Sequence, residues 1–172
     1  MKLIALILLI AGTHVCHASK IVTAFDVARI DYDLAAFENP NDPSSFSFRV
    51  YVAPAFPDGG YVIEGLLKVP KIGEAQGALT LTEKHRNEVT SRRFILTEIQ
   101  SREAYRWFQD AKLLEQTVAE SVDTLVLGGV EILIEGYNCG RYFHLRRNSG
   151  DSQSSAALFR NIEIFRIWKN EK

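Results

Sequence analysis

Apolar and polar residues alternate clearly in the first half of the chain. Between positions 46 and 52, Phe or Val stands at every even position and Ser, Arg or Tyr at every odd one. This period of two predicts a strand with one buried face. Turn residues, among them Gly59, Gly60 and Pro70, separate the next apolar stretches. The first half therefore predicts an antiparallel meander, whose further strands span 61–69, 78–83 and 89–96.

The hydrophobic period changes to that of a helix after Thr97. Thr97 and Gln100 fit a capping box, in which each side chain bonds the other residue's backbone N–H. Good helix formers follow to about Gln116, without Gly or Pro. Ser101 is a second possible N-cap, so two helix starts one turn apart stay open. The expected inner face of this helix consists of Ile99, Ala104, Phe108 and Ala111.

The second half predicts a return to strands and then a terminal helix. Residues 125–127 and 130–135 predict strands, and the chain turns at 136–140 and returns over 141–147. Apolar spacings of three and four from Leu158 to Trp168 favour an amphipathic helix, with a final strand as the alternative. A turn symmetric about Asn138 sets Glu135 opposite Arg141. One strand face would then carry Ile132, Ile134, Tyr142, His144 and Arg146.

Together these elements predict one α+β domain over residues 19–172. An antiparallel sheet of about six strands should pack one apolar face under a mid-chain helix and a C-terminal helix. Residues 19–34 fit neither period, and we expect a strand or a partly extended segment there.

The first eighteen residues have the layout of a secretory signal. Lys2 precedes an apolar run over 3–11, and a more polar stretch ends at the small residue Ala18. The run is shorter than the roughly 20 residues that span a bilayer. We therefore expect residues 1–18 to be a signal peptide and the mature protein to begin near Ser19, in the periplasm or outside the cell. Lipid attachment at Cys16 is the less favoured alternative, because 13–15 lack the usual Leu and small residue.

Composition narrows the class of partner. The net charge is −1, and no block of basic residues stands out, so we expect no nucleic acid and no anionic membrane as partner. No phosphate-binding loop, dinucleotide fingerprint or zinc-protease motif is present in the sequence, and we expect no cofactor. The mature chain keeps one cysteine, Cys139, which has no partner for an internal disulfide.

Several side chains are candidates for chemistry. Cys139 and His144 lie near one hairpin and could form a thiolate–imidazole pair, but the expected turn sets them apart. Two of the strand carboxylates Glu64, Glu131 and Glu135 could share a cleft for acid–base work, although pairing with Arg or Lys is commoner. The candidate binding residues share one strand face and include an aromatic anchor: Tyr142, His144 and Arg146.

The order of these marks resembles that of a loose group of exported or envelope-associated bacterial proteins of unknown function. The marks are the strand from Phe46, the capped helix at Thr97, the strand ending at Glu135, and Gly140 and Tyr142 of the next strand. The resemblance implies export but no particular activity. We expect a non-enzymatic binding, accessory or inhibitor-type protein with a protein or small-molecule partner in the cell envelope. The alternative is a small hydrolase that uses the strand carboxylates or Cys139 with His144.

Overall fold

The computed structural model describes residues 24–40, 42, 44–54, 59–110, 130–148 and 153–168. The expected signal peptide, the end of the mid-chain helix beyond residue 110 and the expected strand at 125–127 lie outside these residues.

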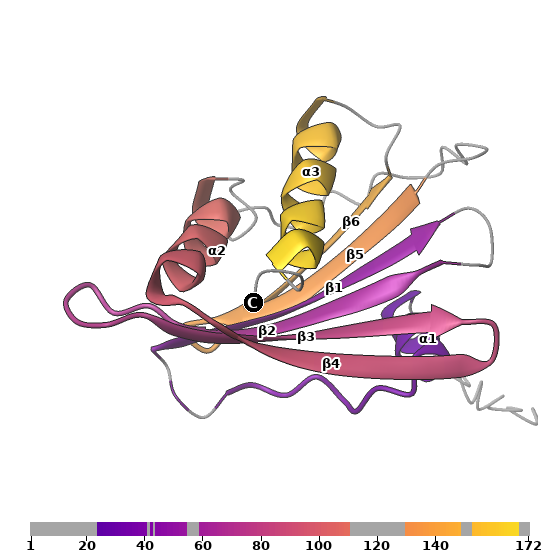
Figure 1. Cartoon of the computed structure of the whole chain (residues 1–172), viewed down its shortest axis with the longest axis horizontal. Helices are drawn as coiled ribbons and strands as arrows, with labels where there is room; N and C mark the ends of the chain where they lie inside the picture. The colour runs from indigo at the N-terminus through magenta and orange to yellow at the C-terminus, as the bar shows by residue number, and fades with distance from the viewer. Residues whose placement is uncertain are drawn as a thin grey trace, which may run out of the picture.

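One antiparallel sheet forms the centre of the molecule, as predicted. Its six strands are arranged in the order β4-β3-β2-β1-β5-β6. Two helices, α2 and α3, lie above one face of the sheet, and α1 lies below the other (Figure 1). We call these the upper and lower faces. The elements are α1 Ala24–Asp31, β1 Ser45–Pro54, β2 Tyr61–Lys68, β3 Gln76–His85, β4 Glu88–Leu96, α2 Glu98–Asp110, β5 Val130–Asn138, β6 Arg141–Asn148 and α3 Gln153–Trp168.

The main core lies between the upper face and the two helices. Phe48 of β1 is fully buried there and stands in register between Gly65 and Gly136 on the neighbouring strands. A Cβ atom on Gly65 would lie 2.2 Å from the Phe48 ring, and one on Gly136 would lie 2.3 Å from the ring of Phe143. The two glycines therefore make room for aromatic rings that lie flat across the strands.

Helix α2 starts as the capping box predicts. The Gln100 N–H donates to Thr97 Oγ1 at 3.2 Å, and the Thr97 N–H donates to Gln100 Oε1 at 3.0 Å. Ser101, the rival cap, lies buried inside the helix. Ala104 and Phe108 are buried as expected, but Ile99 is 70% exposed. The buried stripe runs through positions 101, 104 and 108, and Ile99 lies off that stripe in the first turn.

Helix α3 confirms the terminal helix and closes the core. Ile162 and Phe165 are buried, at 0% and 5% exposure. The Phe165 ring lies 5.8 Å from that of Phe48, between centroids, and 5.6 Å from that of Trp107 on α2. Phe165 therefore joins the sheet and both helices.

The lower face is also covered, which corrects two predictions. Residues 24–31 form a helix rather than a strand, and β1 is buried on both faces rather than one. Phe25, Ala28 and Tyr32, spaced by three and four, pack on a second small core that contains Tyr51. Val27 and Ile30 are apolar but exposed, at 51% and 75%, and they obscured the helical spacing in the sequence. The helix uses a narrower apolar stripe than the sequence pattern indicated.

The β5–β6 hairpin has a different register from the one predicted. Asn138 pairs with Arg141, so Glu135 stands opposite His144 rather than Arg141. The turn residues Cys139 and Gly140 both have positive φ, 49° and 74°. This two-residue turn shifts the pairing by three positions relative to the predicted turn centred on Asn138. Because three is an odd number, residues of β5 and β6 that were predicted to share a face lie on opposite faces. The lower face of this hairpin therefore carries Leu133, Glu135, Tyr137, Tyr142, His144 and Arg146.

Candidate functional site

A buried arginine on the lower face is the centre of the most polar part of the sheet. Arg49 of β1 is 3% exposed and stands in register between Glu64 of β2 and Glu135 of β5. Its Nε and Nη2 donate to Glu64 Oε1 at 2.8 and 2.5 Å. Its Nη1 lies 3.4 Å from Glu135 Oε1 and 3.2 Å from the carbonyl oxygen of Ala35. One guanidinium thus joins both carboxylates to the segment that follows α1.

Two tyrosines complete the bonding of Glu135. The Tyr51 hydroxyl donates to Glu135 Oε1 at 2.9 Å, and the Tyr142 hydroxyl donates to Oε2 at 3.1 Å. Both oxygens of this carboxylate, whose residue is 7% exposed, therefore have partners. We call Arg49, Tyr51, Glu64, Glu135 and Tyr142 the Arg49 cluster.

The ionisation states of the cluster follow from burial and from the carboxylates. Burial alone lowers the pKa of Arg49, but the charge of Glu64 and the bonds to Glu64 and Tyr51 outweigh this effect and raise it. Burial, reinforced by the negative charge of Glu135, raises the pKa values of Tyr51 and Tyr142 well above the usual range. Both phenols therefore stay protonated at neutral pH and act as donors.

Aromatic rings surround the cluster and extend to the β6 edge. The ring of Phe37, in the segment after α1, lies 4.9 Å below the Arg49 guanidinium carbon and 5.7 Å from the ring of Tyr137. From Tyr137 the contacts continue to Tyr142 at 5.2 Å and from Tyr142 to His144 at 5.7 Å. We call this set the ring band: Phe25, Phe37, Tyr51, Tyr137, Tyr142 and His144.

The structure separates the three candidate binding residues into two settings. Tyr142 and His144 belong to the ring band, and His144 also packs edge-on against Phe25 of α1 at 5.8 Å. Arg146, further along β6, is ion-paired with Glu131. Tyr142 is 49% exposed, so one ring of the band faces solvent while its hydroxyl is bonded to Glu135.

The structure does not bring the candidate catalytic side chains together as pairs that are available for chemistry. Glu64 and Glu135 converge, but both bond to the same arginine, and Glu131 pairs with Arg146 instead. Cys139 is exposed in the β5–β6 turn, whereas His144 lies three residues beyond Arg141, about 10 Å along the strand. The register thus sets the thiol and the imidazole apart.

Sequence reasoning missed Arg49 and Tyr51, which it assigned to a solvent-exposed strand face. One signal could have found them. Arg49, Glu64 and Glu135 are charged residues inside three strands with many apolar positions. A charge that such a strand buries needs a charged partner, and these three can provide one another with it.

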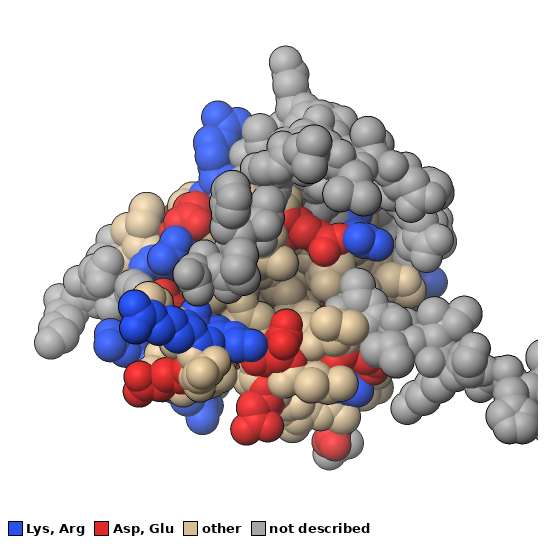
Figure 2. Space-filling model, turned by 90° about the vertical axis from the view of Figure 1, so that its right-hand side faces the viewer, with Lys and Arg blue, Asp and Glu red and all other residues tan. Residues whose placement is uncertain are grey.

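Other kinds of site receive no support from the described residues. They contain no group of three or more His, Cys, Asp and Glu side chains that could hold a metal ion. Their helices include none that is long and apolar enough to cross a membrane. On the end of the molecule that Figure 2 shows, Lys and Arg form one group at the lower left, and Asp and Glu lie below and to the right of it.

Comparison with known proteins adds no family. No protein-family model matches the chain, and no curated protein is significantly similar to it in sequence.

Proposed function

We propose that the protein is an exported, non-enzymatic binding protein of the cell envelope, of an accessory or inhibitor type. Its ligand face would be the solvent-exposed part of the ring band on β6, around Tyr142 and His144, with Arg146 at its end. The partner would be a protein or a small molecule of the envelope.

The observation that carries this proposal is the setting of Tyr142. Its ring is 49% exposed, and it contacts the rings of Tyr137 and His144. Its hydroxyl is bonded to a buried carboxylate. An aromatic side chain that is held in place before binding loses little entropy on contact, and Tyr is enriched among residues that dominate binding energy.

The direct test is photo-crosslinking from position 142 in envelope preparations of the native host. A photoreactive phenylalanine analogue at 142 should give a defined adduct. The same analogue at Ile167, which is 57% exposed on α3 over the other face, should not. With the purified partner, Tyr142→Ala should weaken binding about 30-fold, the effect of losing about 2 kcal/mol. Ile167→Ala should leave the affinity unchanged.

Two results would count against this function. One is an equal yield of adducts from positions 142 and 167. The other is turnover of an ester, amide or glycoside that Glu135→Gln or Cys139→Ser abolishes while the fold is kept, since that outcome would establish the hydrolase alternative.

A further inference from the structure

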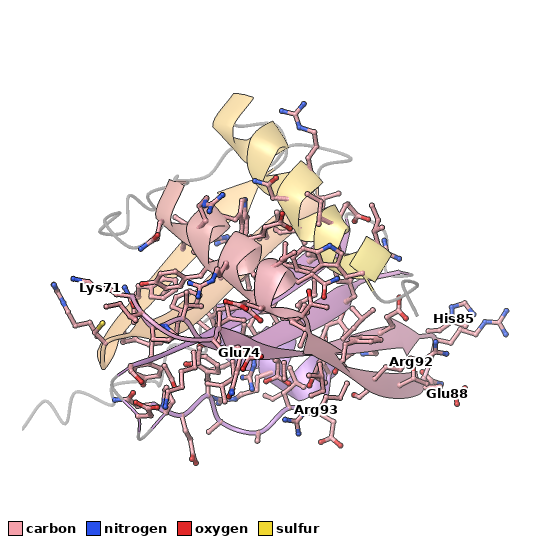
Figure 3. All side chains as sticks on the ribbon, turned by 60° about the vertical axis from the view of Figure 1, so that its left-hand side comes forward. Lys71, Glu74, His85, Glu88, Arg92 and Arg93 are labelled. Atoms are coloured by element: carbon pink, nitrogen blue, oxygen red, sulfur yellow. The ribbon has the colours of Figure 1, made fainter. Side chains whose placement is uncertain are left out.

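Strand β4 forms the edge of the sheet opposite to β6. Among the described strands it pairs only with β3. Every side chain from Glu88 to Arg93 is exposed, and so is Ile95, at 76%. Figure 3 shows Glu88, Arg92 and Arg93 along this outer edge. An edge strand keeps a row of unpaired backbone N–H and C=O groups that a further strand can bond.

The charge of this edge differs from that of the whole chain. Positions 84–94 carry four Lys or Arg residues and one Glu, a net charge of +3, whereas the chain as a whole has −1. Lys84 is paired with Asp31, but within the described part of the chain no ion pair involves Arg92 or Arg93. Arg146 of β6 differs, because it is bonded to Glu131.

Arg92 and Arg93 also point to opposite faces of the sheet. Arg92 stands opposite Leu81 of the upper core, and Arg93 stands opposite Thr80 on the lower face. On the lower face, Arg93 is flanked two residues further along by the exposed Ile95. A strand added beside β4 would therefore meet one positive charge on each of its faces and an apolar side chain next to one of them.

We propose that β4 is a docking edge for an extended acidic segment of a partner protein, which adds to the sheet as a seventh strand. Backbone pairing provides the attachment, and two adjacent acidic residues opposite Arg92 and Arg93 provide selectivity. A second copy of this chain fits less well. Antiparallel self-pairing centred on β4 sets Arg92 against Arg92, and directly opposed like charges are destabilising.

The test uses a designed probe. The peptide Thr-Val-Thr-Glu-Glu-Thr-Thr-Val-Lys, blocked at both ends and run antiparallel to β4, sets Glu opposite Arg92 and Arg93, Val opposite Ile95 and Lys opposite Glu88. Binding is followed by anisotropy of a labelled peptide and by backbone amide shifts in the ¹⁵N-labelled protein. We expect shifts concentrated in β4, and binding at least tenfold weaker for Arg92→Glu combined with Arg93→Glu. Arg106→Glu, at an exposed position of α2, should leave binding and melting temperature unchanged. Tyr142→Ala should leave the binding of this peptide unchanged.

Two further peptides separate strand addition from simple attraction of charge. A peptide with Lys-Lys in place of Glu-Glu should bind at least tenfold more weakly. So should one N-methylated at the alternate residues whose N–H groups face β4, because it lacks the donors that pair with the strand. The proposal is overturned if the acidic peptide does not bind or shifts no β4 amide, or if either modified peptide binds equally well. Protection of β4 amides by concentration-dependent dimerisation, without peptide, would assign the edge to a second copy and also overturn it. Because Tyr142→Ala should leave peptide binding at β4 unchanged, failure of this proposal and failure of the proposed ligand face on β6 can be told apart.

Discussion

Replacing Arg49 with Met tests whether the Arg49 cluster holds the lower face together. The substitution keeps much of the volume and removes the guanidinium that bonds Glu64 and Glu135. The side chain of Glu64 is 30% exposed and can turn to water, but that of Glu135 is 9% exposed and stays buried. The main cost is therefore the loss of a charged partner from Glu135. Breaking a buried pair in this way costs about 3–5 kcal/mol.

That loss is large against the roughly 5–15 kcal/mol by which domains of this size are stable. Urea unfolding followed by tryptophan fluorescence measures it. The matched control is Arg93→Met, in the same row of the sheet but exposed and without an ion pair among the described residues, and it should change stability by less than about 0.5 kcal/mol.

A double-mutant cycle identifies the source of the cost. Glu135→Gln removes the buried charge and keeps one acceptor oxygen, for Tyr51 or for Tyr142, because the two hydroxyls bond different oxygens of Glu135. The double variant with Arg49→Met should therefore be more stable than the sum of the single losses, by about 0.5–3 kcal/mol. A loss below about 1 kcal/mol for Arg49→Met, or strict additivity in the cycle, would refute a tightly coupled buried cluster.

Four further predictions concern other parts of the chain. Phe165→Ala should lower the free energy of unfolding in urea by about 3–5 kcal/mol, because the ring is buried between the sheet and the helices. A chain truncated before Ser155 should lose cooperative unfolding. Burial and the charge of Asp31 raise the pKa of Tyr32 to about 12. Since the unfolded chain then binds fewer protons than the native one, stability should fall as pH rises from about 10 towards 12, and Tyr32→Phe should reduce that fall. Cys139→Asn should keep or slightly raise the melting temperature, and Cys139→Ser should change it by a few degrees at most, because the turn is exposed and Asn-Gly favours positive φ. The intact mass of protein from its native host should correspond to a start near Ser19, without lipid at Cys16; a retained, diacylated Cys16 would contradict the signal-peptide prediction.

The sequence predicted the elements better than their pairing. The strands of the meander, the capped helix and the terminal helix each carry a periodic pattern over six or more residues, and each is present in the structure. The predicted register of β5 and β6 was wrong, because the pairing depends on the two turn residues. The favoured pattern for such a turn is Asn-Gly or Asp-Gly, whereas here Cys139 takes the first position with φ of 49°. Without that signal, a turn centred on Asn138 was equally reasonable.

The same limit explains why the candidate site was only half predicted. Tyr142 and His144 could be chosen from their shared strand face, but Glu135, which bonds Tyr142, joins that face only in the observed register. Alternation along β1 showed a polar stripe through Arg49 but could not show whether another segment covers it. That cover comes from α1 and the Ala35 carbonyl. A buried polar stripe is thus a property of the assembled sheet, and the charged residues in neighbouring strands are its best sign in sequence.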